Sequence, residues 1–303
     1  MKFKILDRIA IILINIAIII AMAVGPALIL AGSPSYYRNQ FEKNGIYSEI
    51  DEDGKITPHP IYFLGGESGR RGYFKDEQLN AIADHIVDFI FGDTESFELV
   101  MDDVVVNGRL EDDVRIFGDA AVTHMDDVKS LMLFGKWASI FSVILLPFLI
   151  AYVIWRRREM GRIVLQYSVI FFGALLLLLG GLCLISLINA NGDFFSTFWE
   201  YAHHLFFPFN PEKVQGSFFN DTLTMILTLD LFMDAVIIVL STLILSLGAW
   251  FAGAIIIYRK YGRQNLVKES VTKLEEKNIV KDVSKKSGSK KKRKNKSKKN
   301  RKS

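Results

Sequence analysis

The sequence predicts an all-α integral membrane protein with four transmembrane helices, a small mixed extracytoplasmic cap and a disordered basic cytoplasmic tail. Half of the 303 residues are hydrophobic. The apolar residues form four runs that each reach the roughly 20 residues that a helix needs to cross a bilayer. Charge is also separated along the chain, because residues 258–303 contain 19 Lys and Arg against 4 Asp and Glu. Such a pattern is typical of a multi-pass membrane protein.

The four apolar runs set the expected organisation of the chain. The first run is longer than the roughly 7 to 15 apolar residues of a signal peptide core, which favours a retained anchor over a cleaved leader. The expected segments are a first transmembrane helix at 1–31, a cap with a helix leading into the membrane at 32–131, a second transmembrane helix at 132–155, a cytoplasmic turn at 156–162, a third transmembrane helix at 163–190, an extracytoplasmic interfacial loop at 191–234, a fourth transmembrane helix at 235–258, and the tail at 259–303.

Short basic segments predict the orientation, because Lys and Arg close to membrane helices stay on the cytoplasmic side. Arg156, Arg157 and Arg158 lie in the turn between the second and third runs, and Arg259 and Lys260 follow the fourth run. The opposite side is acidic, since residues 32–131 contain 21 Asp and Glu against 9 Lys and Arg. We therefore expect a protein of the cell membrane with both termini in the cytoplasm.

The predicted cap combines one helix with short strands. Five apolar residues share one face of a helix that begins at Asp76 and ends at Gly92. Short strands are expected at 97–100 and 104–106, with Asn107-Gly108 as a turn. Residues 118–130 should form a helix that continues into the second transmembrane helix, because no Pro or Gly separates Asp119 from Phe134. The apolar helix face consists of Leu79, Ile82, Ile86, Phe89 and Ile90.

The basic tail favours binding to anionic lipid of the inner leaflet. Runs such as Lys290 to Lys294 repel themselves and stay disordered. Each basic residue near an anionic surface contributes about 1 kcal/mol. No nucleic-acid partner is expected, because the tail beyond Gln264 has no aromatic residues on which bases could stack. A solvated topology signal is the alternative interpretation of the same charges.

Two histidine stretches are the candidate functional residues. In the first, His124 and Asp127 are three residues apart, so on a helix the carboxylate can orient the imidazole. The alternative is an acidic helix N-terminus with an exposed histidine. In the second, His203 and His204 lie among aromatic residues, and Glu200 is within one helical turn of both. Histidines that bind lipid headgroups at the interface are the alternative there.

Other kinds of chemistry have less support in the sequence. The only cysteine, Cys183, lies in the third apolar run, where a thiol has no nearby base. No serine-hydrolase, phosphate-binding or H-E-x-x-H motif is present. Acid/base catalysis by imidazole remains, and it is worth about 10² to 10⁴ in rate.

With these histidine stretches and four membrane helices, the chain resembles the lipoprotein intramolecular transacylase (Lit) family of Gram-positive bacteria. The resemblance rests on the stretch 124–129 leading into the second helix, on His203 with Phe206 and Phe207 after the third, and on the stretch 231–234 at the end of the outer loop. It spans about residues 1–263. The chain departs from the family pattern at Ala121, Ala202 and His204.

The resemblance implies an acyltransferase that acts on diacylglyceryl-modified lipoproteins. It would move an acyl chain from the diacylglyceryl group of the amino-terminal cysteine to the α-amine of the same residue. Of His124 and His203, one would remove the ammonium proton and the other would protonate the leaving glyceryl oxygen, while Asp127 orients His124. No cofactor and no metal is required by this scheme. The expected substrate-binding residues are Phe206, Phe207, Asp126, Lys129 and His204, and membrane lipid surrounds the site.

Two other functions stay open on sequence grounds. A metal-dependent membrane hydrolase could use His124, His203 and His204, with Asp127 as an oxygen ligand. A sensor or assembly protein without enzymatic activity could use the acidic cap and the basic tail. His59 and His85 are expected to have no special role.

Overall fold

The computed structural model confirms the four membrane-spanning helices. It describes residues 3–47, 49–50, 56–57, 62–67, 69–92, 94–188 and 221–262, together with Val271 and Glu275. Within this part of the chain, four helices are long and apolar enough to cross a membrane. These candidate spans are Ile5–Ala31, Asp119–Trp155, Met160–Gly181 and Leu229–Tyr261.

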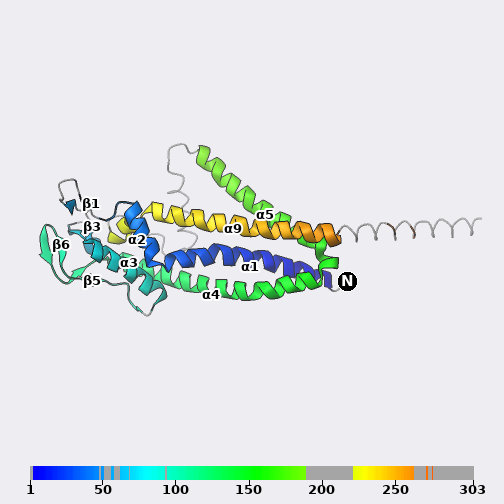
Figure 1. The fold of residues 1–303 in the computed structure, drawn as a ribbon. Coiled ribbons are helices and arrows are strands. Elements are labelled where there is room, and N and C mark those ends of the chain that lie inside the picture. The colour runs from blue at the N-terminus through cyan, green and yellow to red at the C-terminus, as the bar shows by residue number, and fades with distance from the viewer. Residues whose placement is uncertain are drawn as a thin grey trace, which may run out of the picture.

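Three of the long helices lie side by side, and the fourth diverges from them (Figure 1). Helix α5 contacts α9 near the end of the bundle that holds the N-terminus and leads away from it towards the other end. Helices α5 and α9 each begin six residues before the transmembrane segments expected at 163 and 235. Polar residues at a helix end can continue the helix, so apolar length alone sets such boundaries too narrowly. The helices are α1 (Phe3–Ala31), α4 (Asp119–Trp155), α5 (Arg157–Ile188) and α9 (Leu229–Ile257), which continues into the π-helix η2 (Tyr258–Gly262).

The bundle packs through an apolar cluster and through small residues. Ile11, Ile14 and Ile18 share one face of α1 and contact residues of the other three helices. A side chain at Gly135 of α4 would come within 2.9 Å of Val24 on α1, so these two helices approach closely there. Small residues permit such contacts between membrane helices.

A buried ion pair joins α1 to α4 at the end of the bundle opposite the cap. Arg156 donates to both carboxylate oxygens of Asp7, at 3.4 and 3.2 Å. The Tyr152 hydroxyl donates to the same carboxylate at 2.8 Å. Only 3% of the Asp7 side chain is exposed. Three donors thus compensate one buried carboxylate, as a charge in a low-dielectric environment requires.

The cap is mixed, as expected, and its described residues form two α-helices, one short 3-10 helix and three small antiparallel sheets. Its largest sheet has the strand order β3-β4-β6-β7, and two further sheets pair β1 with β2 and β5 with β8. The elements are α2 (Pro34–Lys43), β1 (Glu49–Ile50), β2 (Ile56–Thr57), β3 (Tyr62–Phe63), η1 (Leu64–Gly66), β4 (Arg71–Tyr73), α3 (Asp76–Phe91), β5 (Val100–Met101), β6 (Val104–Val106), β7 (Arg109–Glu111) and β8 (Val114–Arg115).

Helix α3 and the β6–β7 hairpin confirm two expectations. The apolar face of α3 is buried in the cap core, and the helix ends before Gly92. Asn107 and Gly108 both have positive φ, 50° and 81°, between paired Val106 and Arg109. This is the conformation that an Asn-Gly turn favours.

The strand expected at 97–100 was wrong, because regular pairing begins only at Val100. Phe97 is completely buried instead. Its ring stacks on Phe117 with 4.5 Å between centroids and packs 5.1 Å from Phe89. The apolar pattern of this segment therefore reflects packing under α3 and not a place in a sheet.

Candidate functional site

Helix α4 carries the first histidine stretch from the cap into the membrane. The helix is continuous from Asp119 to Trp155, as expected from the absence of helix breakers. Ala121 and Met125 on one face are buried in the cap core, at 0% and 3% exposure. His124 lies at the edge of this face and is half-buried, with its Nδ1 atom shielded from solvent. Ala121, at a position where the chain departs from the family pattern, is therefore a core residue here.

The acidic residues of the first stretch face solvent. Asp126 and Asp127 are both exposed. Asp127 follows His124 by about one helical turn, so the two side chains project from neighbouring positions of the same helix. The structure thus leaves the Asp127 carboxylate accessible beside a histidine that is partly enclosed.

Lys129 contacts the cap, although the sequence suggested a substrate-binding role. Its ammonium group donates to the Thr94 carbonyl at 2.8 Å. The same group lies 4.5 Å from the centre of the Phe89 ring, which is a cation–π contact. These contacts connect α4 to the segment after α3, so Lys129 has a structural role in addition to any contact with substrate.

Replacing Lys129 by methionine is expected to lower the free energy of unfolding by about 1 to 2 kcal/mol. The variant loses one charge-assisted hydrogen bond and one cation–π contact but keeps the length of the side chain. Thermal unfolding in detergent measures this loss. Arg109→Met, at an exposed cation of β7, is the matched control and should leave stability unchanged. Unchanged stability of Lys129→Met with a raised KM would instead assign the lysine to substrate.

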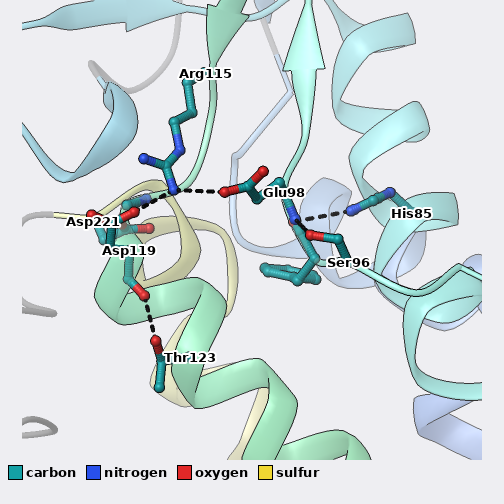
Figure 2. Close-up of polar contacts among 9 residues, drawn as sticks. His85, Ser96, Glu98, Arg115, Asp119, Thr123 and Asp221 are labelled. Carbon is teal, nitrogen blue, oxygen red and sulfur yellow. Dashed lines mark hydrogen bonds and ion pairs between the residues drawn. The ribbon is translucent and has the colours of Figure 1, made fainter.

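A charged network surrounds the start of α4 (Figure 2). Arg115 of β8 donates to Glu98 at 3.3 Å and also pairs with Asp119 in the first turn of the helix. The Thr123 hydroxyl donates to the Asp119 carbonyl. Acidic groups near a helix N-terminus interact favourably with the helix dipole and stabilise the helix. The network therefore connects the sheets of the cap to the helix that carries His124.

His85 packs against the cap core residue Phe97 and is not part of this network. Its Nε2 lies 3.1 Å from the Phe97 carbonyl oxygen, and its ring packs against the Phe97 ring. The role of His85 in the structure is therefore packing and hydrogen bonding within the cap.

Asp221 is a buried carboxylate that the sequence reasoning overlooked. It precedes the short helix α8 (Thr222–Ile226), and only 2% of the residue is exposed. Its Oδ1 accepts from the Leu223 N–H and its Oδ2 from the Gly118 N–H, both at 2.8 Å. Burial raises the pKa of the Asp221 carboxyl, while the two N–H donors and nearby Arg115 act in the opposite direction. An Asp before a short apolar segment is an N-cap signal, and that signal could have identified it.

The start of α9 also packs on the cap. Asp234 accepts hydrogen bonds from Gln40, at 2.9 Å, and from Lys43 of α2. The Tyr36 hydroxyl donates to the Leu231 carbonyl at 2.7 Å. The stretch 231–234, which carries part of the family resemblance, therefore lies against the first helix of the cap.

The second histidine stretch lies outside the described residues. This applies to His203 and His204 and to the aromatic residues Phe206 and Phe207. Within the described ranges, no group of three or more His, Cys, Asp or Glu side chains is placed to hold a metal ion. The half-buried position of His124, one helical turn before the exposed Asp127, is compatible with acid/base chemistry by an imidazole and with its orientation by a carboxylate.

The comparison with known families agrees with the fold and with the motifs. The sequence matches the family profile of the lipoprotein intramolecular transacylase Lit over residues 9–213. The chain belongs to this family. The match extends from α1 to beyond the second histidine stretch, and the family is one of acyltransferases. Membership supports a role in lipoprotein acyl transfer. No curated protein matches the chain.

Solved structures of Lit share the fold. The membrane-integral lipoprotein intramolecular transacylase Lit from Bacillus cereus is 14% identical, with a TM-score of 0.50, and the match covers 89% of this chain and 99% of that one. A variant of the same Bacillus cereus protein, with one histidine replaced by arginine, is 12% identical with a TM-score of 0.50 over 86% and 96% of the two chains. At these identities the likeness shows the fold alone.

Proposed function

We propose that this Lit family member moves an acyl chain from the diacylglyceryl group of a lipoprotein's amino-terminal cysteine to the α-amine of that cysteine. The observation that carries the proposal is the family match, because its residues 9–213 contain both histidine stretches. The position of His124, where α4 leaves the cap core for the membrane, supports it. A substrate whose acyl chains lie in the bilayer presents its ester near this depth.

The proposed reaction converts an ester into an amide. The amine nitrogen attacks the ester carbonyl, the bond to the glyceryl oxygen breaks, and the proton lost by the amine is matched by the proton gained by that oxygen. His124 and His203 act as the base and the acid, and Asp127 orients His124. Water must stay out, since hydrolysis would compete. The remaining proposed substrate contacts come from Asp126, Lys129, His204, Phe206 and Phe207.

The proposed site faces the outside of the cell. The short basic turn around Arg156 to Arg158 supports a cytoplasmic position for that end of the bundle, because such turns are retained inside. Both termini then lie in the cytoplasm and the acidic cap lies outside. The basic tail is proposed to bind anionic lipid of the inner leaflet.

Expression of the chain in bacteria whose lipoproteins keep a free α-amine is expected to produce the lyso form of these lipoproteins. In this form one acyl chain is on the α-amine of the cysteine and one remains on the glyceryl group. The product has the same mass as the diacylglyceryl substrate, so intact mass cannot distinguish them. Mild alkaline hydrolysis before mass spectrometry distinguishes the product from the substrate, because it removes ester-linked acyl chains and leaves an amide-linked chain in place. One retained chain on the amino-terminal peptide supports the proposal, and loss of both chains contradicts it. Chelator in the assay tests the metal-dependent alternative, which requires loss of activity.

A further inference from the structure

We propose that Asp221 is a positioning residue for this acyl transfer. Its carboxylate connects the chain that follows the second histidine stretch to the N-terminus of α4, the helix that carries His124. The inference rests on the proposed function and adds a residue to it. The contact joins positions 103 residues apart in sequence.

The two carboxylate oxygens of Asp221 have different tasks. Oδ1 accepts from the Leu223 N–H and so caps α8 locally. Oδ2 accepts from the N–H of Gly118, the residue that precedes α4 and has no side chain with which to cap the helix. An acidic group from a distant segment thus supplies the negative charge that a helix N-terminus favours. His124 follows Gly118 by six residues, which is about 9 Å along the helix axis.

The surroundings of Asp221 show that this contact is tightly packed. A Cβ atom at Gly118 would lie 2.9 Å from Asp221 Oδ2 and 3.0 Å from the Gly65 carbonyl oxygen. A Cβ atom at Gly66 would lie 3.3 Å from the Gly118 Cα. The neighbouring Thr222 hydroxyl donates to the Phe63 carbonyl at 3.0 Å. Three segments of the chain, η1, the start of α4 and α8, therefore meet around one carboxylate.

This connection affects the helix that carries His124. Without the contact to Gly118, the start of α4 loses its link to Asp221 and α8. Keeping His124 in its reactive position then costs more entropy. Misplacement of reacting groups by about 1 Å can lower a rate about 100-fold.

A simpler role, as the N-cap of α8 alone, makes a different prediction. Serine is also a good N-cap and can accept from the Leu223 N–H, but it has only one oxygen. Asp221→Ser therefore keeps the cap of α8 and removes the acceptor for the Gly118 N–H. Asp221→Asn is a second variant that keeps the size of the side chain but only one oxygen acceptor, so its NH2 group would face one of the two N–H donors.

The experiment compares both variants with the wild-type protein in proteoliposomes that contain a diacylglyceryl lipopeptide. We expect kcat per folded molecule for lyso-lipopeptide formation to fall about 10- to 100-fold in Asp221→Ser, with KM close to wild type. The melting temperature should fall modestly, because the buried Gly118 N–H loses its acceptor. Hydrogen exchange of the Gly118 amide, measured without substrate, should become faster. Asp221→Asn should also lower kcat and speed the exchange, because its single oxygen cannot accept from both N–H groups.

The outcomes separate this proposal from the proposed function. Wild-type turnover in Asp221→Ser, with faster exchange at Gly118, would overturn the positioning role alone. A rise in KM at constant kcat would overturn it too, because it would indicate a loss of substrate binding. A wild-type protein that makes no lyso product would instead overturn the proposed function, and the positioning role would fall with it.

Discussion

Replacing His124 by alanine is expected to lower the rate of lyso-lipoprotein formation by about 10² to 10⁴-fold. This is the usual contribution of a general acid or base, and His124 lies on α4 next to Met125 of the cap core. Alkaline hydrolysis and mass spectrometry of the lipoprotein amino terminus measure the change. His203→Ala should have an effect of the same order, because the proposed reaction needs both a base and an acid.

His85→Asn is the matched control for this prediction. His85 is a half-buried residue of the cap, and its Nε2 is 3.1 Å from the Phe97 carbonyl oxygen. The control should therefore lower stability modestly and leave the rate per folded molecule unchanged. Normal product formation by folded His124→Ala would contradict the catalytic role of His124. Asp127→Asn should give a smaller loss than His124→Ala, since an orienting group does not transfer the proton itself.

Replacing Asp7 by alanine is expected to destabilise the protein by about 3 kcal/mol, the second large effect. The variant leaves the buried end of Arg156 and the Tyr152 hydroxyl without their shared acceptor. Removing one partner of a buried ion pair typically costs about 3 to 5 kcal/mol, and the 18% exposure of the Arg156 side chain favours the lower end. Thermal unfolding in detergent measures the loss.

Two further variants test the cause of this loss. Arg8→Ala removes an exposed charge next to Asp7 on the same helix and should leave stability nearly unchanged. The double variant Asp7→Leu with Arg156→Leu removes both charges, and it should be more stable than Asp7→Ala because no buried charge remains. Equal destabilisation by Arg8→Ala would show that the ion pair is not responsible.

The membrane helices could be predicted from the sequence because their signal is local. Apolar length gave four spans, and the absence of Pro and Gly between Asp119 and Phe134 predicted the continuous helix α4. Helix α3 was likewise predicted from its own periodicity. In each of these cases the residues that decide the structure lie within a few turns of one another.

The sheets of the cap and the Asp221 contact could not be predicted in the same way. Strand β4 pairs with β6, and Gly72 lies opposite Val106, so two- and three-residue strands are fixed by partners far along the chain. Phe97 has the pattern of a strand residue but packs in the core. The acceptor for the Gly118 N–H comes from a residue 103 positions away. Such contacts depend on tertiary packing, which periodicity does not report.

The length of α4 sets the height of His124 relative to the opposite side of the bilayer. Its 37 residues extend for about 55 Å at 1.5 Å per residue, well beyond the roughly 30 Å of a hydrocarbon core. The Asp7–Arg156 pair fixes one end of this helix to α1, and the cap core encloses the other end. The helix therefore keeps His124 at a fixed distance from the Asp7–Arg156 pair. We expect a change in bilayer thickness to alter the distance between His124 and the ester of the proposed substrate.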